Sequence, residues 1–182
     1  MKRRSIREGS RNYLPKYSKI PRFTSDDVYF RLRVLFDVIG YYSPTQDGPL
    51  GKDGKDINKL GGITSFDPLH PLTTWKQNSC AVMVGFNPNE KKGYWNVFAY
   101  TNDENLGWQQ QLLTTVNSNT LVIIDCKVSA GKAYYSLDQG ENWIAILDAD
   151  LRWIKWFVGP YHGGNKPSPV RGIIYSKIEL IK

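Results

Sequence analysis

The chain has 182 residues, of which 41% are hydrophobic and 23% charged, as expected for one globular domain with a buried core. Aromatic residues make up 13%, which favours β structure, aromatic contact surfaces or both. No run reaches the roughly 18 apolar residues of a membrane-spanning helix, and the basic start of the chain has no apolar stretch of signal-peptide length, so we expect neither a membrane span nor secretion by that route.

The first 24 residues carry the entire net charge of +7. Their basic side chains are Lys2, Arg3, Arg4, Arg7, Arg11, Lys16, Lys19 and Arg22, against the single acid Glu8, and 8 − 1 = 7. Pro15 and Pro21 interrupt any helical pattern, so we expect an extended cationic arm over residues 1–24 and a formally neutral folded body over residues 25–182.

Three roles are open for this arm. It could be a solvated tail, an anchor that orders on other proteins of an assembly, or a contact to nucleic acid through phosphates. The spacing of its apolar side chains favours a protein groove over nucleic acid. The predicted anchoring residues are Lys2, Arg3, Arg4, Arg7, Arg11, Tyr13, Tyr17 and Arg22.

The body begins with a strand and a polar loop. In VYFRLRVLFDVIGYY, residues 28–42, the side chains alternate, and one face carries Phe30, Leu32, Val34, Phe36 and Val38. The following segment, SPTQDGPLGKDGKDINKLGG, is rich in Gly, Asp, Lys and Pro, which predicts a loop over residues 43–62.

Eight further segments read as strands separated by short turn sequences. They cover residues 81–86, 94–101, 108–116, 120–128, 132–137, 142–148, 151–159 and 172–182. No amphipathic helix longer than two turns is evident. This pattern predicts an all-β fold, a two-sheet antiparallel jelly-roll sandwich.

The sequence gives no reason to expect a metal or another cofactor. His70 and His162 are isolated from other ligand types, and the acids of residues 47–56 match a calcium loop only loosely. Cys80 and Cys126 lie in apolar strand-like runs, which favours reduced core thiols; a disulfide between them is the alternative.

SLDQGENW, residues 136–143, matches the S-x-D-x-G-x-x-W pattern of sialidases and other β proteins. The motif predicts a hairpin in which Asp138 accepts backbone N–H groups, Gly140 adopts a positive φ and Trp143 packs beside the turn. It occurs once here, whereas sialidases repeat it on successive propeller blades. We therefore interpret Ser136, Asp138, Gly140 and Trp143 as structural residues.

KAYYSLDQGENWIAI, LRWIKWFVGPYHGGNKPSP and IIYSKIEL together resemble the C-terminal half of a concanavalin A-like jelly roll of the laminin-G and polysaccharide-lyase group. The resemblance covers residues 119–182 and implies two curved sheets with carbohydrate bound on the concave face. The candidate carbohydrate-binding residues are Trp75, Trp95, Trp108, Tyr161, His162 and Asn165. For each tryptophan, packing in the core is the favoured alternative.

Catalysis is not expected from the residues alone. Glycoside hydrolysis needs two carboxylates that flank the bond, and the acids of this chain fall mainly in turns. A lyase needs a base and a cation that neutralises the uronate, which Tyr161, His162 and Lys166 could supply. We therefore predict no enzyme and no catalytic residues, with a polysaccharide lyase as the enzymatic alternative.

The favoured hypothesis is a non-enzymatic structural or adhesive protein of a phage virion, assembled in the host cytoplasm. It would serve as a capsid decoration or a head or tail fibre, attached to other virion proteins by its arm, homo-oligomeric, and able to bind glycans. The alternatives are a polysaccharide lyase or free lectin, and a nucleic-acid-binding module that uses the basic arm.

Overall fold

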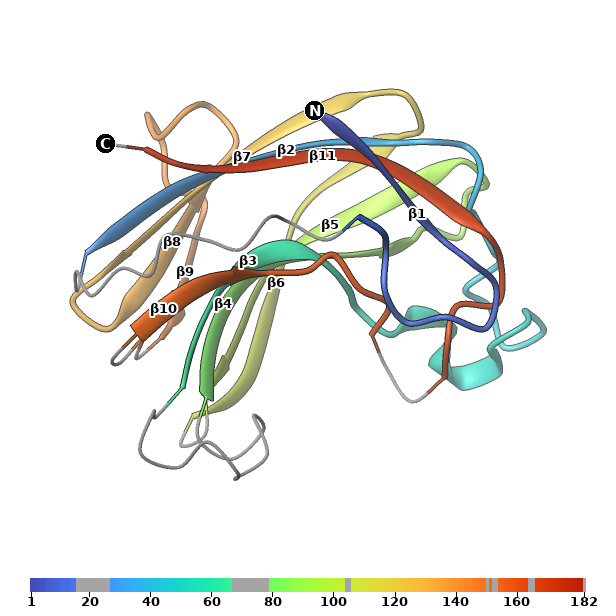
Figure 1. Ribbon diagram of the computed structural model, residues 1–182, viewed down its shortest axis with the longest axis horizontal. Coiled ribbons are helices and arrows are strands. Elements are labelled where there is room, and N and C mark those ends of the chain that lie inside the picture. The colour runs from blue at the N-terminus through green and yellow to red at the C-terminus, as the bar shows by residue number, and fades with distance from the viewer. Residues whose placement is uncertain are drawn as a thin grey trace.

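The computed structural model describes residues 1–15, 27–66, 79–103, 106–149, 151, 154–163 and 166–181. These residues form two antiparallel sheets that pack face to face (Figure 1), which confirms the predicted all-β jelly-roll sandwich. A 3₁₀ helix, η1 (Gly51–Lys55), lies in the chain between strands β2 (Val28–Phe36) and β3 (Asn58–Phe66). Within the described ranges, no helix has the length and apolar character needed to cross a bilayer.

The strand order of the six-stranded sheet is β1 (Lys2–Ile6), β11 (Gly172–Leu180), β2 (Val28–Phe36), β7 (Leu121–Ser129), β8 (Lys132–Ser136) and β9 (Ala145–Asp148). The order of the five-stranded sheet is β10 (Ile154–Val158), β3 (Asn58–Phe66), β4 (Ser79–Pro88), β5 (Tyr94–Asp103) and β6 (Gly107–Asn117).

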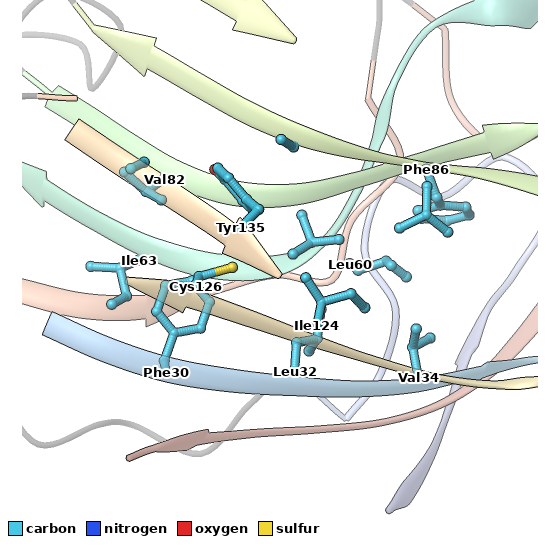
Figure 2. Close-up of a cluster of buried hydrophobic side chains, with 14 of the residues drawn as sticks. Phe30, Leu32, Val34, Leu60, Ile63, Val82, Phe86, Ile124, Cys126 and Tyr135 are labelled. Atoms are coloured by element: carbon cyan, nitrogen blue, oxygen red, sulfur yellow. The ribbon is translucent and has the colours of Figure 1, made fainter. Parts of the chain in front are cut away.

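The core lies between the two sheets, where alternate side chains of each strand point inward. On β2, Phe30, Leu32, Val34 and Phe36 are fully buried, whereas Val38 lies beyond the end of the strand and is exposed. Figure 2 shows Phe30, Leu32 and Val34 on the same side of the interior as β7, and facing side chains of β3 and β4 from the opposite sheet. Cys126 belongs to this core as a free thiol, and the side chain of Cys80 lies outside the described residues.

The beginning of the chain differs from the expected extended arm. Residues 2–6 form β1, which pairs with β11 at one edge of the six-stranded sheet (Figure 1). Ile6 is 1% exposed and Tyr13 5% exposed, and both belong to the hydrophobic core. Ile6 therefore occupies an ordinary inward-facing strand position within this basic sequence.

The predicted anchoring residues have unlike environments. Arg4 is buried, and its Nε donates to Ser176 Oγ at 2.8 Å. Lys2, Arg3, Arg7 and Arg11 are exposed, and Tyr17 and Arg22 lie outside the described residues. Their contacts to other molecules stay a prediction.

The hairpin of residues 136–143 has its polar groups satisfied locally. Ser136 Oγ accepts the N–H of Gly140 at 3.0 Å, and Asp138 Oδ1 accepts the N–H of Asn142 at 2.9 Å. Gly140 has φ +89°, which a side chain would oppose. Trp143 packs edge-on against Tyr29 and Tyr134, so the turn lies on the outer surface of the six-stranded sheet.

Candidate functional site

The outer face of the five-stranded sheet gathers polar and aromatic side chains from segments far apart in the sequence. On β4 and β5, Val82, Val84, Val97 and Ala99 are buried in the core, so the residues between them face outward. The strand register places these outward positions in rows. One row is Tyr161, Lys59, Gly85, Phe98 and Leu112; the next contains Gly62, Met83, Tyr100 and Gln110.

Lys59 reaches this face because β3 has an irregular register between Lys59 and Gly61. Such a bulge inserts an extra residue, and here it lets Leu60 and Ile63 both enter the core while Lys59 faces outward. The Lys59 Nζ donates to the carbonyl oxygen of Ile57 at 2.8 Å and lies 3.9 Å from the centre of the Tyr100 ring.

The ammonium group of Lys59 is desolvated. The residue is 8% exposed, and burial lowers its pKa to about 8, against a smaller opposing effect of Asp56. Because the aromatic face of Tyr100 and a single carbonyl are weak substitutes for water, this cation would gain from an anionic ligand.

Tyr161 is held beside Lys59 by the backbone. The two residues exchange both hydrogen bonds, each 2.9 Å long, which places their side chains on the same face. The Tyr161 hydroxyl lies 3.9 Å from Met83 Sδ. Burial, with a smaller contribution from Tyr100, raises the pKa of Tyr161 to about 12, so its hydroxyl keeps its proton at neutral pH.

His162 and Lys166, the other two members of the set that a lyase could use, lie elsewhere. His162 is 3% exposed, its Nδ1 is 3.0 Å from the carbonyl oxygen of Gly163, and its ring packs near Tyr42. Burial lowers its pKa, which keeps it neutral. Lys166 contacts the carbonyl oxygen of Leu50 at 3.2 Å and Asp53 at 3.7 Å.

The tryptophans that the sequence predicts to bind carbohydrate have different environments. Trp95 is 4% exposed, stacks on Phe36 in the core and donates its indole N–H to Ser118 Oγ at 3.1 Å. Its place agrees with the alternative interpretation, core packing. Trp108 is 63% exposed on β6. Trp75 and Asn165 lie outside the described residues.

Sequence reasoning missed Lys59 and Tyr100. The sequence predicts a loop at Lys59, because the glycines and lysines of residues 43–62 outweigh the short apolar pattern that follows. Tyr100 lies in a predicted strand, but its position next to Lys59 depends on β3 pairing with β4, which no local motif states.

No family model and no curated protein matches the sequence. Among solved structures, the fold is similar to that of the alginate lyase Aly36B, with 13% identity, a TM-score of 0.62, and coverage of 99% of this chain and 80% of that one. The similarity to an alginate lyase of Pseudomonas aeruginosa has 13% identity and a TM-score of 0.55, and covers 89% of this chain and 67% of that one. The similarity to an alginate lyase of a Chlorella virus has 11% identity and a TM-score of 0.53, and covers 98% of this chain and 84% of that one.

These similarities show a fold shared with polysaccharide lyases. They also correct two expectations, that the chain is a non-enzymatic structural protein and that it is no enzyme. The three solved structures named above are alginate lyases, which favours the enzymatic alternative. The expectation rested mainly on the absence of a carboxylate pair, which hydrolysis requires and which does not bear on a lyase.

Proposed function

We propose that the chain is a polysaccharide lyase that cleaves a uronate-containing polymer by β-elimination. The observation that carries the proposal is the pairing of Lys59 and Tyr161 on one face of the five-stranded sheet, with Tyr100 beside them. The fold shared with three alginate lyases supports it and makes alginate the first substrate to test.

β-Elimination places three demands on a site. The C5–H bond of the uronate breaks and its proton passes to a base, the electron pair forms the C4–C5 double bond, and the C4–O4 bond breaks as O4 takes a proton. Because the carboxylate on C5 already carries a negative charge, a cation or a strong donor must neutralise it before the C5 proton can leave.

Lys59 is the residue that meets the substrate carboxylate in this proposal. With a pKa of about 8, it is mostly protonated at pH 7. Its burial excludes water, which strengthens the attraction between the ammonium group and an arriving carboxylate. The same attraction raises the lysine's own pKa, so substrate binding keeps Lys59 charged.

Tyr161 is the proton-transfer residue. Its raised pKa of about 12 keeps the hydroxyl protonated in the free protein, so it can give this proton to the leaving O4, and the phenolate so formed takes the C5 proton of the same substrate, which restores the hydroxyl. Tyr100, whose pKa burial also raises, lies close enough to affect Tyr161 electrostatically and completes the polar part of this face.

The test is incubation with alginate and with other uronate polymers while the ultraviolet absorbance of the new double bond is recorded. Wild-type protein should produce unsaturated ends, and Tyr161→Phe should lower kcat by about 100-fold or more, as expected for removal of a proton-transfer group. Tyr175→Phe is the matched control, because Tyr175 lies on β11 of the other sheet.

Two outcomes would overturn the proposal: no double bond from any uronate polymer, or full activity of Tyr161→Phe. Polymer binding without cleavage would instead identify a lectin. The particle setting, the homo-oligomer and the nucleic-acid contact stay predictions from the sequence.

A further inference from the structure

A tryptophan on β6 is exposed on the same sheet face as the proposed catalytic residues. Gln109 points inward, where its side chain bonds both the carboxylate and the backbone N–H of Asp148, so its neighbour Trp108 points outward. Trp108 is 63% exposed and Leu112, further along the same face, is 52% exposed. Trp95 is buried in the core, whereas the indole of Trp108 is exposed to water and would be stabilised by contact with a ligand.

The register locates Trp108 relative to Lys59. Trp108 lies opposite Asn102 on β5, and β6 lies three strands from β3. The row of Lys59 ends at Leu112, four residues along β6 from Trp108. With strands about 4.8 Å apart and a rise of about 3.3 Å per residue, Trp108 is roughly 20 Å from Lys59. It is therefore too far to touch the sugar that reacts at Lys59 and Tyr161.

The chemistry of this edge suits a sugar ring of an acidic polymer. An indole face stacks on the C–H surface of a sugar, and the amides of Asn102 and Gln110 flank Trp108 with groups that can bond hydroxyls or carboxylates. None of the eleven residues of β6 is acidic, so an anionic chain meets no like charge on this strand.

We propose that Trp108 is a remote subsite that stacks one sugar ring of the same uronate polymer whose bond is cleaved at Tyr161. The proposal rests on the proposed function for the direction of the polymer, which would run obliquely across the five-stranded sheet from β6 toward β3. Binding energy gained at Trp108 would favour long chains over short ones, because only a long chain reaches both places.

The experiment measures the binding of long alginate and of a uronate trisaccharide by calorimetry, in protein carrying Tyr161→Phe to prevent cleavage. Adding Trp108→Ala should weaken long-chain binding about 3- to 10-fold, the loss expected for one aromatic contact. Trisaccharide binding should not change, and Trp108→Phe should restore most of the long-chain affinity. The control is Leu121→Ala, an exposed apolar residue on β7 of the other sheet.

Unchanged long-chain binding in Trp108→Ala would overturn the subsite, and so would an equal loss for the trisaccharide. The two proposals fail separately. If wild-type protein forms no double bonds but long-chain binding still depends on Trp108, the proposed function fails and the subsite stands. If cleavage is observed but Trp108→Ala leaves the KM for long alginate unchanged, the proposed function stands and the subsite fails.

Discussion

At the scale of single residues, Lys59 carries a conflict between folding and function. Folding removes its ammonium group from water and leaves it one carbonyl oxygen and an aromatic ring as neighbours. The proposed reaction requires that same group to be charged. The charged ammonium group is destabilised in the free protein and stabilised when a substrate carboxylate binds beside it. The desolvation that lowers the stability of the free protein therefore strengthens substrate binding.

This conflict predicts how stability depends on pH. The native pKa of Lys59 is about 8 and its ordinary value is 10.5, so between these values the unfolded chain binds more protons than the native one. The free energy of unfolding should therefore rise with pH across this window, by up to about 3 kcal/mol for a shift of this size. Lys59→Met, which keeps the apolar stem and removes the charge, should abolish that rise.

Urea unfolding of both proteins at several pH values from 7 to 10 provides the measurement. The difference in unfolding free energy between Lys59→Met and wild type should be largest at pH 7 and shrink toward pH 10. Tyr161 limits the window, because its raised pKa makes native stability fall with pH above about 10. Parallel curves for the two proteins would show that Lys59 is not desolvated in the native state.

At the scale of elements, the strands with a period of two were predictable and β3 was not. The alternation of β2 is explicit in the sequence, and its inward residues form the core as expected. β3 contains the pair Gly61–Gly62, which locally favours a loop. The structure needs glycine at this point, because a Cβ on Gly62 would lie 2.2 Å from the carbonyl oxygen of Val82.

The candidate site was predictable only in part for the same reason. Tyr161 stands in a glycine-rich segment and could be singled out locally. Its partners Lys59 and Tyr100 lie on β3 and β5, and only the bridge between Tyr161 and Lys59 and the strand order β3, β4, β5 bring the three together. His162, next to Tyr161 in sequence, is buried near Tyr42 instead.

Tyr135 of β8 links the two sheets behind the site. Its side chain crosses the interior (Figure 2), and its hydroxyl lies 2.9 Å from the carbonyl oxygen of Tyr100 and 3.1 Å from that of Met83. Tyr135→Phe should lower the free energy of unfolding by about 1–3 kcal/mol, because it removes a buried donor. Urea unfolding measures this loss.

Tyr134→Phe is the control for that variant, since Tyr134 packs on the outer surface against Trp143 and should lose little. If both phenylalanine variants unfold at the same urea concentration as wild type, the hydroxyl of Tyr135 is not a link between the sheets.

At the scale of the whole molecule, charge and packing divide the N-terminal segment in different ways. The segment carries all of the net charge, which suggested an independent arm. Its inward residues nevertheless complete the sandwich, and residues 12–14 form backbone contacts with Pro160, Tyr161 and Ser5. Most of the described basic residues of this segment are exposed, although Arg4 is buried, and the burial of Ile6 and Tyr13 determines where the segment packs.

Deletion of residues 1–15 should therefore unfold or strongly destabilise the protein. Burial of Ile6 alone is worth about 3 kcal/mol by comparison with other core aliphatic residues, and β1 also satisfies the edge of β11. The measurement is thermal unfolding followed by circular dichroism.

The control replaces the exposed Lys2, Arg3 and Arg7 with serine, which removes three charges and leaves Ile6 and Tyr13 in the core. That variant should unfold close to the wild-type temperature because surface substitutions cost little. A deleted chain as stable as wild type would mean that the first strand is dispensable, and the segment would again be a candidate for an independent arm.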